Sequence, residues 1–458
     1  MERSASRQRN HKRQRFWSST LRLLIVAATL HLATTAAAFT LGRRAIMPDA
    51  FDANGVAVQF ASDGDGYRED AATLAKMLWG GKLHEWFSAA YPFHVKLYSI
   101  CFASFGAIFG FNILSAEPFN LFCYLGILLL VYKLGNEMFD SRAALMASGM
   151  AALWPTFLLH TTQLLKDPLF ILGMLALIFL IVQLLMRPDS WRRSLLRGAL
   201  GGILATVIWK ARSDMGPMLI GTVLLGTLML VVRQFKLSRA AYGNLAGGIL
   251  LTLLTIAALL WLPVYRDADN PRIKAAANYA SHNVKPVAVD WWQLPARVGL
   301  ARERFIEKYS DAGSNIDPDV KLMSTADLIR YVPRAVAIGL FAPFPNMWFV
   351  TGSTVGLSGR MLAGLEMIIT YAIELLAVVA LCQRWRQLSL WLLFSIVAIG
   401  ITALGLVVVN IGTLYRLRYL YLILLIIPAA AALEYFLDWF IKSRNPNLGS
   451  HRTLARST

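Results

Sequence analysis

Long apolar runs alternate with short charged connections along most of this 458-residue chain. A membrane-spanning helix needs about 20 predominantly apolar residues. Runs of this kind predict ten spans, at 21–41, 118–134, 143–160, 168–186, 196–210, 215–232, 243–263, 359–382, 388–411 and 419–440. The first run also has the flanks of a cleavable signal peptide, but in a chain with many spans we expect it to remain as an anchor. The pattern predicts an all-α polytopic membrane protein.

The charged connections predict how these spans are oriented. Five of them are rich in Lys and Arg, namely 133–142, 187–197, 233–239, 383–387 and 442–446. Basic connections favour the cytoplasmic side. With a cytoplasmic N-terminus, all five reach that side only if a single span lies between residue 42 and Lys133. We therefore expect the short aromatic run within 94–111 to form an external interfacial helix, and both chain ends to be cytoplasmic.

This topology predicts how the chain is divided. The expected parts are a basic cytoplasmic tail (1–20), a transmembrane module (21–263) with a first external loop (42–117), a large external loop or lid (264–358), C-terminal spans (359–440) and a second cytoplasmic tail (441–458). No internal repeat is evident, which disfavours a transporter built from inverted repeats.

Composition supports the membrane class and narrows the partners. Hydrophobic residues make up 57% of the chain and charged residues 16%, below the roughly 25% of a typical soluble domain. The net charge of +18 suits anionic lipid headgroups in a protein of this kind, so we expect membrane lipids and no nucleic acid as partners. Cys101, Cys123 and Cys382 are far apart and predict neither a disulfide nor a metal site.

Acidic residues gather at two positions that this topology places outside. ASDGDGYRED (61–70) contains Asp63 and Asp65, and the short turn in HTTQLLKDPLF (160–170) contains Lys166 and Asp167. A solvated loop would explain the first group, and a helix cap would explain Asp167. Because both turns lie on the same predicted side, we expect their carboxylates to converge.

Basic residues at the same side run against the usual charge bias. WKARSDMGP (209–217) contains Lys210 and Arg212, and NIGTLYRLRYLY (410–421) contains Arg416 and Arg418. Phosphate binding is one explanation, and snorkelling toward headgroups is the other. A carboxylate that takes a proton from a hydroxyl, with cations that stabilise a departing phosphate, suits transfer from a lipid phosphate.

Three stretches, DGDGYREDAATLAKMLWGG (63–81), ALWPTFLLHTTQLLKDPLF (152–170) and NIGTLYRLRYLY (410–421), resemble the GT-C superfamily of polyprenyl-phosphate-sugar-dependent glycosyltransferases. The resemblance is strongest to protein O-mannosyltransferases and lipid A aminoarabinose transferase. The likeness covers residues 20–240 best. It implies a GT-C-like helical bundle that transfers a sugar from a polyprenyl-phosphate-linked donor to a hydroxyl of a glycan, lipid or protein acceptor. It also implies inversion at the anomeric carbon, a carboxylate base, and a site on the periplasmic face of a bacterial inner membrane.

The resemblance also implies residue roles. We expect Asp63 to be the base, Asp65 to orient it or a bound divalent cation, and Asp167 to be the second acidic site. Gly64 and Gly66 are expected to turn the backbone sharply so that both carboxylates enter one pocket, where each would raise the proton affinity of the other. The predicted substrate-binding residues are Tyr67, His94, Lys96, Lys166, Lys210, Arg212, Arg416 and Arg418. His94 and Lys96 stand in YPFHVK, where members of the family have an FEKP-like element, and no zinc-like cluster of ligands is predicted.

Two other functions remain open. A glycan polymerase or ligase that uses a lipid pyrophosphate would depend more on Arg416, Arg418 and the loop 264–358. A lipid-glycan transporter would place polar residues inside its spans, where Glu366 and Glu374 are the exceptions in otherwise nearly uncharged helices.

Overall fold

A computed structural model describes residues 2–46, 48, 50–52, 61, 63–236, 242–262, 294–308, 314–350 and 356–444. In these ranges the regular structure is helical, apart from an isolated bridge between Asn315 and Asn410. Parts of the predicted lid, 264–293, 309–313 and 351–355, lie outside the described residues, as does most of the C-terminal tail.

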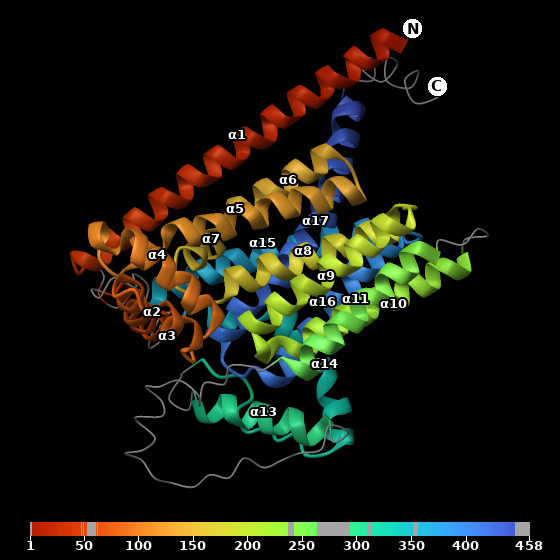
Figure 1. The fold of residues 1–458 in the computed structure, drawn as a ribbon. Helices are drawn as coiled ribbons and strands as arrows, with labels where there is room; N and C mark the ends of the chain where they lie inside the picture. Colours follow the sequence, from red (N-terminus) through yellow and green to blue (C-terminus); the bar gives the residue numbers. More distant parts are fainter. Residues whose placement is uncertain are drawn as a thin grey trace.

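The helices follow one another along the chain with short connections (Figure 1). They are α1 (Glu2–Arg43), α2 (Asp63–Trp79), α3 (Leu83–Ser88), α4 (Phe93–Phe109), α5 (Ile113–Met138), α6 (Ser141–Ala152), α7 (Pro155–Thr161), α8 (Asp167–Met186), α9 (Trp191–Ala211), η2 (Ser213–Met215), α10 (Gly216–Lys236), α11 (Tyr242–Trp261), α13 (Leu294–Lys308), α14 (Thr325–Phe341), η4 (Pro345–Met347), α15 (Gly356–Gln383), α16 (Leu388–Val407) and α17 (Ile411–Arg444).

The predicted spans are confirmed as helices. Within the described residues, nine helices are long and apolar enough to cross a membrane, and α6 with α7 makes a tenth if this pair, bent by 69°, is one broken span. The bend falls where Pro155 begins α7, because proline lacks the N–H that would continue the hydrogen bonding of α6. The chain is an all-α polytopic membrane protein.

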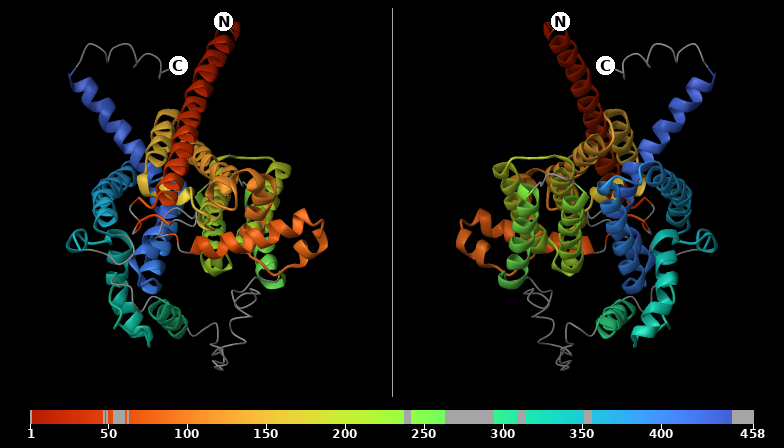
Figure 2. Two further views of the ribbon diagram at one scale, coloured as in Figure 1. Left: turned by 90° about the vertical axis from the view of Figure 1, so that its left-hand side faces the viewer. Right: turned by 90° about the vertical axis from the view of Figure 1, so that its right-hand side faces the viewer.

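Several basic connections lie together at one end of the bundle. Arg187 donates to Glu137 at 2.6 Å, and Gln387 donates to the carbonyl oxygen of Met138 at 3.0 Å. These contacts join the connections after α5, α8 and α15. The first residues of α1 and the last of α17 lie at this end too (Figures 1 and 2). The grouping agrees with the predicted topology, whereas the side of the membrane on which this end lies remains a prediction.

Helices α2 and α4 lie near the other end and run crosswise to the spans (Figure 2). They pack through a small apolar core that includes Ala71 and Leu74 of α2 and Val95 and Phe102 of α4. Helix α4 has 17 residues and is too short to count among the spans. It occupies the place of the predicted interfacial helix, which leaves α5 as the single span between residue 42 and Lys133.

The described part of the predicted lid is fastened to the bundle. Helix α14 packs against the span α16 so closely that a side chain at Gly405 would overlap the backbone of Ala335. In α13, the buried Arg302 donates to the carbonyl oxygens of Asp317 at 2.7 Å and Leu406 at 3.1 Å. These contacts hold α13 and α14 at the end of α16.

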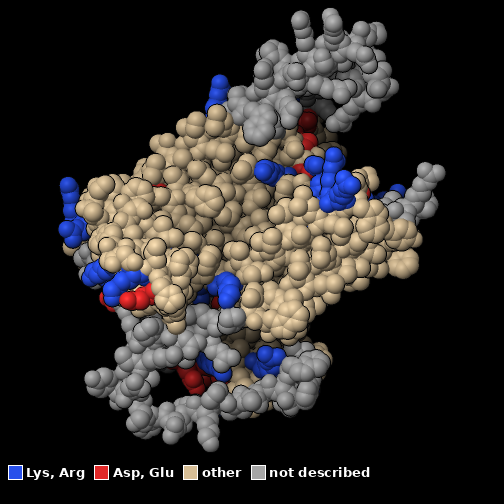
Figure 3. Space-filling model, viewed as in Figure 1, with Lys and Arg blue, Asp and Glu red and all other residues tan. Residues whose placement is uncertain are grey.

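Charged side chains gather toward the two ends of the molecule, with a broad surface of other residues between them on the face seen in Figure 3. This distribution suits helices whose middle parts lie in hydrocarbon and whose ends reach water.

Candidate active site

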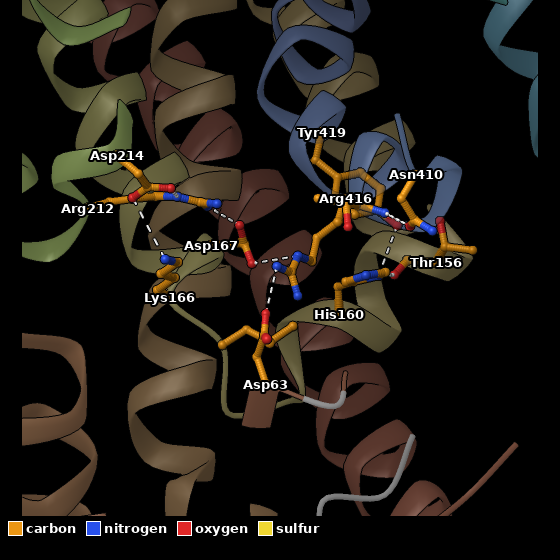
Figure 4. A network of polar contacts seen from close by, with 12 residues as sticks. Asp63, Thr156, His160, Lys166, Asp167, Arg212, Asp214, Asn410, Arg416 and Tyr419 are labelled. Carbon is orange, nitrogen blue, oxygen red and sulfur yellow. Dashed lines mark hydrogen bonds and ion pairs between the residues drawn. The ribbon is translucent and has the colours of Figure 1, made fainter. Parts of the chain in front are cut away.

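Four charged residues from distant parts of the chain meet where α2, α8 and α17 begin. Arg416 lies between two carboxylates: its Nη2 donates to Asp63 Oδ2 at 3.0 Å, and its Nε lies 3.3 Å from Asp167 Oδ2 (Figure 4). Arg212, between α9 and η2, donates through Nη1 to the other oxygen of Asp167. The structure therefore brings together both predicted acidic positions and one residue of each predicted basic pair.

Two further charges extend this group. Arg212 Nε donates to Asp214 Oδ2 at 3.3 Å, and Lys166 Nζ lies 3.7 Å from Asp214 Oδ1. Sequence reasoning missed Asp214, although its place between Arg212 and Pro217 marked it as another charge in the same turn. We call the six residues the ion-pair cluster: Asp63, Lys166, Asp167, Arg212, Asp214 and Arg416. Its three carboxylates and three cations carry no net charge.

A small cavity of about 10 Å³, which leaves room for about one water molecule, lies beside this cluster. Asp167, Arg212 and Arg416 form its charged part. The rest of its lining is largely apolar and comes from α8, η2, α10, α16 and α17: Phe170, Ile171, Met215, Met218, Leu404, Leu417, Leu420 and Tyr421. The cavity thus combines guanidinium groups with hydrocarbon walls, as the binding of an amphipathic anion requires.

A polar network fixes the turn that carries Asp167. The hydroxyl of Tyr98, on α4, accepts from the N–H of Leu165 at 3.2 Å and donates to Asn120 Oδ1 at 2.9 Å. Asn120, on α5, donates to the carbonyl oxygen of Thr162 at 3.0 Å. Sequence reasoning missed both residues. In the sequence each is a polar side chain within an apolar run, and such a pattern does not show which residue it binds.

A second network holds the start of α17. Glu366 Oε1, on α15, accepts from the N–H of Thr156 at 2.8 Å, and Oε2 accepts from Trp154 Nε1 at 3.1 Å and from the hydroxyl of Tyr415. Tyr415 precedes Arg416. Glu366 therefore joins the bend between α6 and α7 to the turn of α17 that carries Arg416.

From Asp63 onward the expected loop is instead helical, which corrects the prediction. Asp63 begins α2, and Gly64 and Gly66 lie within its first turns rather than in a sharp bend. Carboxylates in the first turn of a helix are stabilised by its positive end, which explains why an acidic stretch starts a helix here.

Asp63 and Asp65 point to different cations. Asp65 accepts from Arg68 Nη2 at 2.8 Å within α2, whereas Asp63 is bound to Arg416. The pair does not form the shared carboxylate site that was expected to raise proton affinity or hold a divalent cation. In the described ranges, no group of three or more His, Cys, Asp or Glu side chains is arranged to hold a metal ion.

Tyr67 and His94 lie next to the ion-pair cluster and contact each other edge to face, with ring centroids 4.5 Å apart. His94 is buried, and neither ring nitrogen has a hydrogen-bond partner among the described residues. Burial and the neighbouring Lys166 lower the pKa of His94 to about 3, and burial raises the pKa of Tyr67 well above its usual value. Both side chains are therefore uncharged near neutral pH. Tyr67 packs against His94 at the edge of the cluster, and its role in substrate binding remains a prediction.

Lys96 and Lys210 influence each other electrostatically. Lys96 donates to the carbonyl oxygen of Phe87 at 2.8 Å and lies over the ring of Trp86. Burial and the charge of Lys210, in the last turn of α9, lower the pKa of Lys96. A role for either lysine in substrate binding remains a prediction.

Arg418 points away from the ion-pair cluster. Its Nη1 donates to the carbonyl oxygens of Leu340 at 3.0 Å and Ala342 at 2.7 Å, and its guanidinium lies over the ring of Tyr415. These carbonyls end α14, so the described contacts of Arg418 are those of a residue that joins α14 to α17. The structure does not bring it to the predicted phosphate site.

No family model and no curated protein sequence matches the chain. Among solved structures, the archaeal oligosaccharyltransferase AglB from Archaeoglobus fulgidus, in complex with an inhibitory peptide and a dolichol-phosphate, is similar with a TM-score of 0.45 and 15% identity, over 97% of this chain and 52% of that chain. The crystal structure of the Archaeoglobus fulgidus oligosaccharyltransferase with Zn and sulfate gives 0.43 and 16%, over 76% and 41%.

The apo form of the Archaeoglobus fulgidus enzyme gives a TM-score of 0.44 and 15% identity, over 93% of this chain and 52% of that chain. This chain therefore spans about half or less of the length of these proteins. The likeness is distant and assigns no role to any residue of the ion-pair cluster.

Proposed function

We propose that the protein is a membrane glycosyltransferase that moves a sugar from a polyprenyl-phosphate-linked donor to an acceptor hydroxyl. The observation that carries the proposal is the meeting of Asp63, Asp167, Arg212 and Arg416 beside a largely apolar cavity. Arginines that line an apolar cavity suit a phosphate attached to a hydrocarbon chain, because guanidinium groups bind phosphate oxygens in pairs.

In this reaction Asp63 is the base. The acceptor oxygen attacks the anomeric carbon, its proton goes to Asp63, and the bond from that carbon to the phosphate oxygen breaks. The phosphate leaves with the electron pair, while Arg212 and Arg416 stabilise the charge that develops on it. A single displacement of this kind inverts the anomeric configuration.

Asp167 has a different role from that of Asp63. It is buried and lies against both arginines, so it holds them beside the cavity rather than accepting the proton. Tyr67 and His94 are neutral and border the cluster, which suits contacts with the sugar. We propose that the site opens on the external face and that a glycan, lipid or protein supplies the acceptor hydroxyl.

The proposal is tested with purified protein in lipid nanodiscs, radiolabelled polyprenyl-phosphate sugars and a cell-envelope fraction as the source of acceptors. We expect the wild type to remove the labelled sugar from the lipid. In Asp63→Asn we expect turnover to fall by roughly 10²–10⁴, the range typical of general acid-base catalysis. Label transferred only from matched pyrophosphate donors, or no transfer from any phosphate donor, contradicts the proposed reaction.

A further inference from the structure

Arg416 is shared unequally between its two carboxylates. The side chain of Asp167 is 5% exposed and that of Arg416 is 11% exposed, whereas the side chain of Asp63 is 28% exposed. Asp167 has a second cation in the buried Arg212. Arg416 lines the cavity together with Asp167 and Arg212, whereas Asp63 is not part of the lining. An anion that reaches Arg416 from the cavity would therefore compete with Asp63 for the N–H groups of its guanidinium.

This arrangement is unfavourable for the proposed chemistry as it stands. A carboxylate bound to a guanidinium accepts a proton poorly, because the positive charge stabilises its ionised form. A phosphate also gains little net attraction from a cluster in which three carboxylates already balance three cations. Both difficulties have the same source, which is the contact between Asp63 and Arg416.

We propose that the donor phosphate displaces Asp63 from Arg416, so that the base becomes free only when the donor is bound. The inference rests on the proposed function and adds an order to it: donor first, then proton transfer. Arg416 is an exchanging partner, bound to Asp63 in the empty site and to phosphate in the loaded site.

Exposure and hydrogen bonding indicate which contact breaks. The partly exposed Asp63 is able to recover hydration when it leaves Arg416, whereas Asp167 would be left buried and charged if it lost its arginines. The Nε of Arg416 lies 3.3 Å from Asp167 Oδ2, so this contact with the buried carboxylate stays in place when Asp63 leaves. Arg416 therefore offers the phosphate its Nη2 donor, which Asp63 gives up.

The exchange also balances charge through the reaction. A lipid phosphate esterified to a sugar carries one negative charge, and the lipid phosphate that leaves carries one more. Over the same step Asp63 gains a proton and loses its negative charge. The total charge of the site is thus unchanged, and Asp63 pairs with Arg416 again once it has released its proton to water and the product has left.

The experiment measures the affinity of undecaprenyl phosphate for the wild type, Asp63→Asn and the control Asp65→Asn in nanodiscs. Asp65 lies two residues further along α2 and is bound to Arg68, so the control removes the same charge without freeing Arg416. We expect Asp63→Asn to bind about tenfold more tightly, the effect of removing one charge about 6 Å from the phosphate at an effective dielectric constant of about 40. We expect Asp65→Asn to stay within about twofold of the wild type.

Equal or weaker binding by Asp63→Asn, or equal tightening in both variants, overturns the exchange. Asp63→Ser, a second uncharged variant, must shift affinity in the same direction and replaces Asp63→Asn if that variant does not fold. The proposed reaction fails independently: if Asp63→Asn retains full turnover, Asp63 is not the base, whatever the affinity for the lipid phosphate.

Discussion

Replacing Asp167 by Asn should destabilise the protein more than any other single change in the ion-pair cluster. The Asp167 carboxylate is buried, accepts from Arg212 Nη1 and lies 3.3 Å from Arg416 Nε. Removing one partner of a buried ion pair costs about 3–5 kcal/mol, because the remaining charge is left uncompensated. Arg212 keeps a contact with Asp214, and Arg416 keeps Asp63, so we expect the lower end, about 3 kcal/mol.

A loss of about 3 kcal/mol corresponds to on the order of a hundredfold change in the unfolding equilibrium. It is measured by SDS titration of protein in mixed micelles, with helicity followed by circular dichroism. The matched control is Asp63→Asn, which also removes a carboxylate from Arg416 but at a partly exposed position, where an ion pair contributes about 1 kcal/mol or less.

The two results together test the distinction between the carboxylates. Asp167→Asn is expected to lose stability and donor binding, whereas Asp63→Asn is expected to lose turnover with little change in stability. If Asp167→Asn unfolds at the same SDS concentration as the wild type, the buried ion pairs do not hold this site together, and the separate roles given to Asp63 and Asp167 are refuted.

Four further outcomes are expected. Arg212→Ala should raise the donor KM roughly ten- to a hundredfold, the effect of one lost charge-assisted hydrogen bond of about 1.5–3 kcal/mol. Arg418→Ala should instead lower stability and leave the donor KM unchanged, and donor kinetics and SDS titration measure the two effects separately. The pKa of His94 is about 3 in the folded protein and about 6.5 when unfolded, so the free energy of unfolding is highest above about pH 6.5 and falls as the pH falls toward 3. The wild type should therefore lose about 2 kcal/mol of stability between pH 7 and pH 5 that His94→Phe does not lose. Equal pH dependence of stability in both proteins would contradict this. EDTA should leave turnover unchanged, because arginines already neutralise the carboxylates, and lost activity restored by a divalent cation would argue otherwise. A cysteine at Arg142 should be labelled only from the cytoplasmic side, and external labelling would reverse the predicted orientation.

The spans were predictable because their length is set by the bilayer and their apolar content is unmistakable. The convergence of the turns at Asp63 and Asp167 was also predictable, since counting spans between basic connections put both on the same side. This reasoning requires no knowledge of which helices touch.

The choice between neighbouring basic residues was not predictable. Arg416 and Arg418 are two positions apart on α17, and successive residues turn by about 100° around a helix axis. The two side chains therefore point to nearly opposite sides, and only Arg416 reaches the cluster. The sequence shows the pair but not the rotation of the helix, which is set by its packing against α15 and α16.

The prediction of a sharp turn in the acidic stretch was wrong for a local reason. Asp63-Gly64-Asp65-Gly66 has the composition of a turn, yet the apolar residues that follow, including Ala71 and Leu74, pack against α4 and extend the helix back to Asp63. Once these residues are helical, Asp63 and Asp65 diverge and meet different arginines. Tertiary packing decided this segment against its local preference.

The central claim is that the lipid phosphate of the donor binds at Arg212 and Arg416, beside Asp63. A cryo-electron microscopy structure of the protein in nanodiscs with bound undecaprenyl phosphate tests this most directly. We expect phosphate density within hydrogen-bonding distance of both arginines, the lipid chain against the apolar wall of the cavity, and Asp63 withdrawn from Arg416. Phosphate density away from both arginines, with the contact between Asp63 and Arg416 intact, would contradict the account.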